Sequence, residues 1–191
     1  MPQIEGQVRE GEQLDAEREA RRRLALAQVR QYPDPVLRLR ANEVTEFDEP
    51  LAALAERMTR LMQEARGVGL AAPQIGILQR VLVYQTPEEE RVTALVNPRV
   101  VATGDGSDVA EEGCLSLGAA SVVVPVERPA SLTVEASAPD GSEVRLEVEG
   151  LEARIIQHEL DHLDGVLTID RTGPDDRRRA LADLRPQIVL G

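Results

Sequence analysis

The sequence predicts an α+β fold in which a mainly antiparallel sheet packs around one central helix, with a further helix near each end of the chain. Short runs rich in Val and Leu follow one another in the middle of the chain, and segments with helical spacing lie on both sides of them. Strands that come as a block, without helices between them, are typical of antiparallel sheets. With 191 residues, 42% of them apolar, the chain has the size of one domain with its own core.

The first strong helix pattern covers residues 48–66, where apolar residues recur at intervals of three and four. Asp48 is suited to cap its start, and Pro50 fits the first turn. Residues 67–76 are rich in glycine and small side chains, so we expect a tight, irregular loop there.

Five strands are expected, at residues 80–85, 93–101, 122–126, 131–137 and 143–149. The turn residues Pro139-Asp140-Gly141 separate the last two, which predicts a hairpin. After Gly150 the helical spacing returns and ends near Gly165, and this segment is the predicted central helix. A polar helix is expected from residue 174 to residue 184.

Three parts are expected along the chain. Residues 1–28 form a charge-dense leader, expected to be a loosely attached helix or partly disordered. The prolines of Tyr32-Pro33-Asp34-Pro35 end any helix, so the main domain is assigned to residues 29–172. Residues 173–191 are the C-terminal tail, for which we expect a helix.

Composition excludes several classes of protein. The net charge is −12, and all 22 basic residues are arginines, so direct DNA binding is not expected. Arginines cluster at residues 21–23 and 177–179 but lie among acids, which favours solvated helix faces over a docking patch for RNA or a protein. No apolar run is long enough to span a membrane, the first thirty residues lack a signal-peptide core, and one cysteine forms no internal disulfide.

The two histidines of the chain form the motif His158-Glu159-Leu160-Asp161-His162 within the predicted central helix. Because four residues separate them, both imidazoles project from one helix face and can coordinate one metal ion. Glu159 then lies next to the metal without being a ligand. The alternative is an ordinary helix whose histidines pack or face solvent.

Cys114, the single cysteine, lies in the segment Glu112-Gly113-Cys114-Leu115-Ser116. A thiolate there would complete a set of one cysteine and two histidines and leave one coordination position open. A lone cysteine is more often an inert buried thiol, and carboxylates could also supply the third ligand. The thiolate is therefore a hypothesis at this point.

Three segments, in this order, resemble the peptide deformylases, enzymes that remove the formyl group from the N-terminal methionine of new polypeptides. They are the glycine-rich segment Gly67-Val68-Gly69-Leu70-Ala71-Ala72-Pro73-Gln74, the segment Glu112-Gly113-Cys114-Leu115-Ser116, and Gln157-His158-Glu159-Leu160-Asp161-His162. The resemblance covers residues 29–171 and implies a deformylase-like catalytic domain there.

The resemblance implies a role for each matching residue. Cys114, His158 and His162 would hold one divalent metal ion, with Fe²⁺ expected and Zn²⁺, Ni²⁺ or Co²⁺ also accepted. Glu159 would be the general base and acid. The Gln74 amide and the Leu115 N–H would stabilise the oxyanion. Gly69 would line the approach of the substrate backbone.

Helix geometry adds an expectation about specificity. Leu151 and Ile155 precede His158 by seven and three residues and share its face, so they would form an apolar wall that suits a methionine side chain. Val68 and Leu115 are further candidates for this pocket. The alternative is that Leu151 and Ile155 belong only to the core.

The segment after Ser116 departs from the family. There the family often has a proline-glycine pair and then an arginine, whereas this chain has Leu117-Gly118-Ala119-Ala120-Ser121, and the next arginine is Arg128. We therefore expect the substrate contacts of this segment to differ, while the metal ligands and Glu159 are unaffected.

The expected function is metal-dependent removal of the formyl group from formyl-methionyl nascent polypeptides in a bacterial-type cytoplasm. A transient ribosome contact is a further candidate. Two alternatives are kept: a metallopeptidase that uses the same HExxH motif, and a deformylase-like protein that binds without turnover. The common zinc peptidases take a histidine or glutamate as third ligand, and a degenerate site would be expected to lose Glu159 or Gln74.

Overall fold

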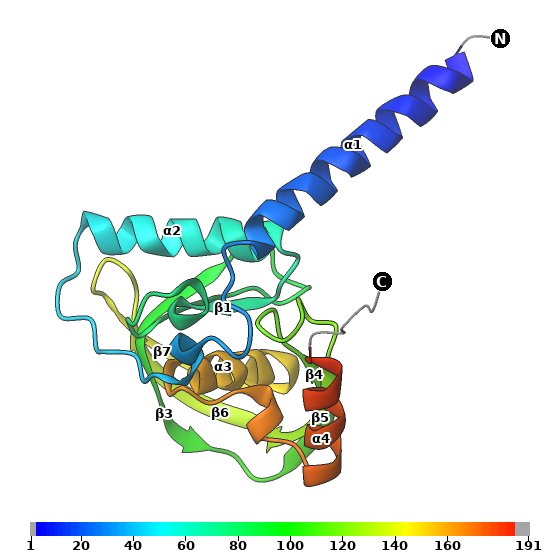
Figure 1. Ribbon diagram of the computed structural model, residues 1–191. Helices are drawn as coiled ribbons and strands as arrows, with labels where there is room; N and C mark the ends of the chain where they lie inside the picture. Colours follow the sequence, from blue (N-terminus) through cyan, green and yellow to red (C-terminus); the bar gives the residue numbers. More distant parts are fainter. Residues whose placement is uncertain (1–2, 186–191) are drawn as a thin grey trace.

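Helix α3 (Gly150–Leu163) lies at the centre of the molecule and contacts strands of both sheets (Figure 1). The computed structural model describes residues 3–185. Its larger sheet is antiparallel, with the strand order β1-β2-β3-β6-β7, and its smaller sheet is the antiparallel pair β4-β5. The predicted α+β class, with a central HExxH helix, is confirmed.

The strands of the larger sheet are β1 (Gly69–Ala71), β2 (Val81–Tyr84), β3 (Thr93–Thr103), β6 (Ser131–Ser137) and β7 (Glu143–Glu149). Those of the smaller sheet are β4 (Ser107–Gly113) and β5 (Val123–Pro129). The other helices are α1 (Gln3–Leu26), α2 (Glu49–Glu64) and α4 (Pro174–Asp183). Short 3₁₀ turns occur at Pro35–Arg38, Ala72–Ile75 and Thr168–Asp170.

Helix α2 begins as the sequence predicts. The Asp48 carboxylate accepts a hydrogen bond of 3.0 Å from the Leu51 N–H, and Pro50 lies in the first turn. The helix buries the face that carries Leu51, Met58, Leu61 and Met62. It covers the same sheet that α3 contacts, so the large sheet is held between helices.

The expectation of an irregular loop at residues 67–76 is wrong. Gly69–Ala71 is strand β1, which pairs with β2, and Ala72–Ile75 is a 3₁₀ turn that ends at Gly76 with φ 81°. Leu70 and Ala71 are both fully buried, so the strand has protein on both faces. Small residues are needed here because neighbours approach closely, and such a strand lacks the alternating pattern that sequence analysis detects.

Strand β4 was not predicted from the sequence. Its residues are mostly polar and exposed, and in the stretch Ser107–Gly113 only Glu112 is buried. Its strand structure comes from pairing with β5 along its whole length, not from an apolar pattern. All five predicted strands are present, and β5 continues to Pro129, beyond the predicted end at residue 126.

Helix α1 projects away from the rest of the molecule, and only its C-terminal end joins the core (Figure 1). Ala25 is fully buried and Val29 is 5% exposed, and both belong to the cluster that contains Met58 and Met62 of α2. The expected division into a leader, a main domain and a tail remains a prediction. Helix α4 occupies the expected place of the C-terminal helix, and residues 186–191 lie outside the described part of the chain.

Over residues 3–185, none of the helices combines the length and the apolar character that crossing a membrane requires.

The packing at the end of α1 makes a testable prediction for stability. Val29→Ala removes two buried methyl groups and should lower the free energy of unfolding by about 2 kcal/mol. Leu24→Ala is the matched control, since Leu24 is 69% exposed, and it should change the free energy by less than about 0.5 kcal/mol. Urea denaturation measures both, and equal effects would show that the segment directly after α1 does not pack in the core.

Candidate active site

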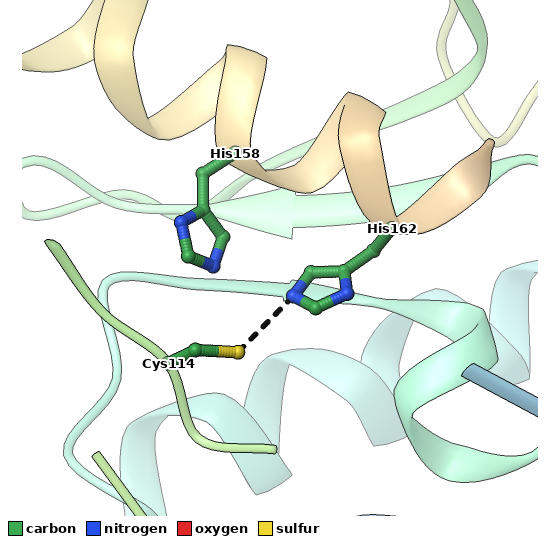
Figure 2. Close-up of side chains that lie close together, drawn as sticks. All are labelled: Cys114, His158 and His162. Carbon is green, nitrogen blue, oxygen red and sulfur yellow. Dashed lines mark hydrogen bonds between the residues drawn. The ribbon is translucent and has the colours of Figure 1, made fainter. Parts of the chain in front are cut away.

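The two histidines of α3 and Cys114 meet at one point of the fold (Figure 2). Cys114 directly follows β4, and its Sγ lies 3.2 Å from His162 Nε2. One ligand atom from each of the three residues lies within 4.8 Å of the others, and all three residues are buried. One soft sulfur and two imidazole nitrogens are a donor set that fits Fe²⁺, Zn²⁺, Ni²⁺ or Co²⁺.

Glu112 fixes the orientation of His158. Its Oε2 lies 3.0 Å from His158 Nδ1, so Nε2 is the ring nitrogen left for a metal ion. Burial opposes protonation, but hydrogen bonds with Cys114 and Glu112 raise the pKa of His158 well above its usual value. Burial lowers the pKa of His162, so the two rings have different environments.

A buried ionic cluster surrounds Glu112. Arg128 donates two hydrogen bonds to Glu112, of 2.6 and 2.8 Å, and a third, of 3.0 Å, to Asp161 of α3. Arg154 and Arg171 add hydrogen bonds to Glu112 and Asp161, respectively. Burial raises the pKa of Glu112, but Arg128 and His158 outweigh it and hold this pKa far below its ordinary value. Glu112 is therefore ionised and unavailable as a base.

Glu159 has the opposite environment. It is 4% exposed, and its Oε2 has no hydrogen-bond partner among the residues that the structure describes. Burial raises the pKa of the Glu159 carboxyl to about 7. A carboxylate with that pKa can both accept and release a proton near neutral pH.

Gln74 directs its amide group toward the same point. Its Oε1 accepts a hydrogen bond of 2.8 Å from the Ala71 N–H, which leaves Nε2 facing the site. Nε2 donates to Ser116 Oγ at 3.2 Å and lies 3.8 Å from Cys114 Sγ. The 3₁₀ turn after β1 thus delivers a polarised N–H group beside the thiol.

A hollow of about 260 Å³ opens onto these groups. The structure brings nine of the ten predicted site residues to its wall, and His162, buried beneath, is the exception. Ile155 is buried, whereas Leu151 and Val68 are 48% and 47% exposed and lie at the mouth. The nine predicted site residues at the wall of the hollow are Val68, Gly69, Gln74, Cys114, Leu115, Leu151, Ile155, His158 and Glu159.

Sequence analysis missed Glu112, Arg154 and Asp161 as parts of the site. Glu112 lies two residues before Cys114, a spacing that places both side chains on one face of an extended chain, but β4 was not predicted. Arg128 belongs to the buried cluster and does not line the hollow. Of the departing segment, residues 117–121, only Ala120 lines it.

The contact between Glu112 and His158 makes a testable prediction for metal affinity. Glu112→Gln removes the charge that holds the ring and leaves Arg128 partly unpaired, so metal affinity should fall about 10- to 100-fold. Glu111→Gln is the matched control, because Glu111 is the exposed neighbour on the same strand. Competitive titration with a chelating dye measures both variants, and equal affinities would contradict this role of Glu112.

Comparison with known proteins agrees with this geometry. The family model described as polypeptide deformylase matches residues 26–178. A peptide deformylase of Natranaerobius thermophilus is 46% identical over 148 residues, 78% of this chain and 93% of that protein. A crystal structure of the Thermotoga maritima peptide deformylase superposes with a TM-score of 0.72 at 45% identity, covering 76% of this chain and 97% of that one. For the Legionella pneumophila peptide deformylase the TM-score is 0.77 at 38% identity, over 82% and 91% of the two chains. The chain belongs to the polypeptide deformylase family.

Proposed function

We propose that this protein removes the N-terminal formyl group from formyl-methionyl nascent polypeptides and releases formate. The observation that carries the proposal is the hollow where a Cys-His-His ligand group, the buried carboxyl of Glu159 and a glutamine amide lie together; Glu159 Oε2 has no hydrogen-bond partner within residues 3–185. Membership of the family supports the same reaction. Neither the metallopeptidase nor the binding-only alternative is favoured by a feature of the site.

Cys114, His158 and His162 are the proposed ligands of one divalent metal ion. We propose Fe²⁺, with Zn²⁺, Ni²⁺ and Co²⁺ as replacements that the same donor set accepts. When bound, the ion would supply a Lewis acid that lowers the pKa of the attacking water toward neutrality.

Glu159 is the proposed proton carrier. Its carboxylate accepts a proton from the attacking water as the oxygen adds to the formyl carbon. When the carbon–nitrogen bond breaks, Glu159 gives the proton to the departing amine, and formate leaves. The pKa of about 7 suits both steps, because one group must act first as base and then as acid.

Gln74 and Leu115 are proposed to stabilise the oxyanion that forms on the former carbonyl oxygen. Gln74 lines the hollow with its Nε2 3.8 Å from Cys114 Sγ, and Leu115, which directly follows Cys114, lines it too. Preorganised N–H donors of this kind stabilise such a transition state by a few kcal/mol each, about 2.7–4 kcal/mol for one donor.

Strand topology suggests how a peptide binds. β1 is the end strand of the larger sheet, and β4 is an end strand of the smaller one. Both contribute to the wall of the hollow, β1 with Gly69 and β4 with residues 111–113. An extended peptide in the hollow would have the edge of a strand on each side. We propose that the substrate backbone forms hydrogen bonds with the edges of β1 and β4. Its methionine side chain would contact Ile155, Leu151, Val68 and Leu115.

A bacterial-type cytoplasm, where formylated chains are made and thiols stay reduced, is the proposed compartment. A transient contact with the ribosome remains a prediction. Arg178 and Arg179 each pair with an aspartate of α4, and Arg177 pairs with Asp170, so this cluster presents little unpaired charge to RNA.

Formate release tests the proposed reaction directly. Protein purified without air and reloaded with Fe²⁺ or Ni²⁺ should release formate from a formyl-methionyl tripeptide, and a chelator should abolish this release. Metal analysis of the protein as purified identifies the native ion. A folded, metal-loaded sample that releases no formate would overturn the proposal.

The role of Glu159 has its own test. Glu159→Ala should retain the metal ion, because the three ligands are untouched, and should lower kcat by about 10²- to 10⁴-fold. Glu64→Ala, at the exposed end of α2, is the control and should keep full activity. Near-normal turnover by Glu159→Ala with a full complement of metal would exclude it as the proton carrier.

A further inference from the structure

We propose that Arg66 recognises an acidic side chain at the third residue of the substrate, and that Glu19 of α1 competes for it. This inference rests on the proposed function and concerns the outer end of the same hollow. Arg66 lines that hollow next to Gly67 and Val68, where the chain passes from α2 into β1.

The backbone holds Arg66 at this rim. It has φ 59°, the left-handed conformation that glycine usually provides just after a helix. The Arg66 N–H donates to the Gln63 carbonyl at 3.0 Å, and the Gly67 N–H donates to the Met62 carbonyl at 2.9 Å. These hydrogen bonds close the end of α2 and fix the position from which the arginine side chain starts.

Of the arginines that line the hollow, Arg66 is the one whose guanidinium remains available to bind a substrate carboxylate. Arg154 also lines it, but its two terminal nitrogens donate to Glu112, the Val126 carbonyl and Asp108. The Arg66 guanidinium makes no hydrogen bond to any residue that the structure describes, and its side chain is 59% exposed. In the described part of the chain its one ion pair is with Glu19 Oε2, at 3.8 Å.

The distance between Gly69 and Arg66 indicates which substrate residue lies near Arg66, and this is the third residue. Gly69 marks the reacting end, because a Cβ there would collide with the Glu159 carboxylate. Three residues of chain separate Gly69 from Arg66, so their Cα atoms lie at most about 10 Å apart. From the formyl carbon to the Cα of the third substrate residue the span is about 9 Å. A substrate bound along β1 therefore places its third side chain near the Arg66 guanidinium.

Two carboxylates oppose this attraction. Glu111 of β4 also lines the hollow and repels an acidic side chain. Glu19 shares its charge between Arg66 and Arg22, whose Nη1 lies 3.7 Å from Glu19 Oε1. Exposed ion pairs of this length are weak, so a substrate carboxylate can displace Glu19 from Arg66.

The test compares two peptides that differ only in charge: formyl-Met-Ala-Glu amide and formyl-Met-Ala-Gln amide. The readout is the ratio of their kcat/KM values for formate release by the metal-loaded, full-length protein. Arg66→Ala should lower the Glu/Gln ratio by about two- to five-fold, the effect of one exposed ion pair. Arg66→Glu should lower it further, and Glu19→Gln should raise it.

Matched variants separate local recognition from the overall charge of the protein. Arg60→Ala removes one charge from α2, and Glu17→Gln removes one from α1, where Glu17 pairs with Arg21. Both should leave the ratio unchanged. An unchanged ratio in Arg66→Ala, or an equal change in Arg60→Ala, would overturn the proposal, as would a ratio that only Glu111→Gln alters.

Binding makes the test independent of turnover. The Kd values of the two peptides for metal-loaded Glu159→Ala should give the same preference for Glu, and Arg66→Ala in that background should remove it. Absence of formate from both peptides would contradict the proposed function. Equal Kd values for both peptides would contradict the role of Arg66 alone.

Discussion

The ionic cluster of Glu112, Arg128 and Asp161 is the interaction on which the site depends. Each of the three side chains is 5–11% exposed, and each comes from a different element: β4, β5 and α3. Removing a charge from water costs several kcal/mol, so such groups remain ionised in the interior only when their hydrogen bonds are satisfied. Arg128 donates to both acids at once, and this requires the three elements to keep one relative position.

The same fixed position of β4, β5 and α3 also holds the metal ligands together. Glu112 is two residues from Cys114 on the same chain, and Asp161 lies between His158 and His162 on α3. A shift of α3 along β4 would separate the thiol from the imidazoles and would also break the contacts of Arg128. A guanidinium suits this function better than an ammonium, because its planar donors bind one carboxylate with two hydrogen bonds. The chain contains no lysine at all.

Local patterns in the sequence predicted the parts of the site that lie close together in the chain. The spacing of His158 and His162, the apolar face of residues 48–66 and the hairpin turn at Gly141 follow from short-range rules, and each has the expected structure. Contacts between distant segments follow no such rule. Arg128 gives no sign in the sequence that it pairs with Asp161, and β4 has no apolar alternation because it is stabilised by β5 and by one buried acid.

The error at β1 has a cause that connects fold and function. Gly69 has no side chain where the Glu159 carboxylate approaches, and any Cβ at this position would occupy the space of that carboxylate. β1 must pair with β2, let Glu159 reach the hollow and leave its other edge open. Two of the three residues of β1, Gly69 and Ala71, are small, and the strand lacks the β-branched pattern by which strands are predicted. The composition that made the segment look like a loop is therefore the composition that the site requires. Within the part of the chain that the structure describes, Glu159 Oε2 stays buried without a hydrogen-bond partner, and β1 beside it has no polar side chain to provide one.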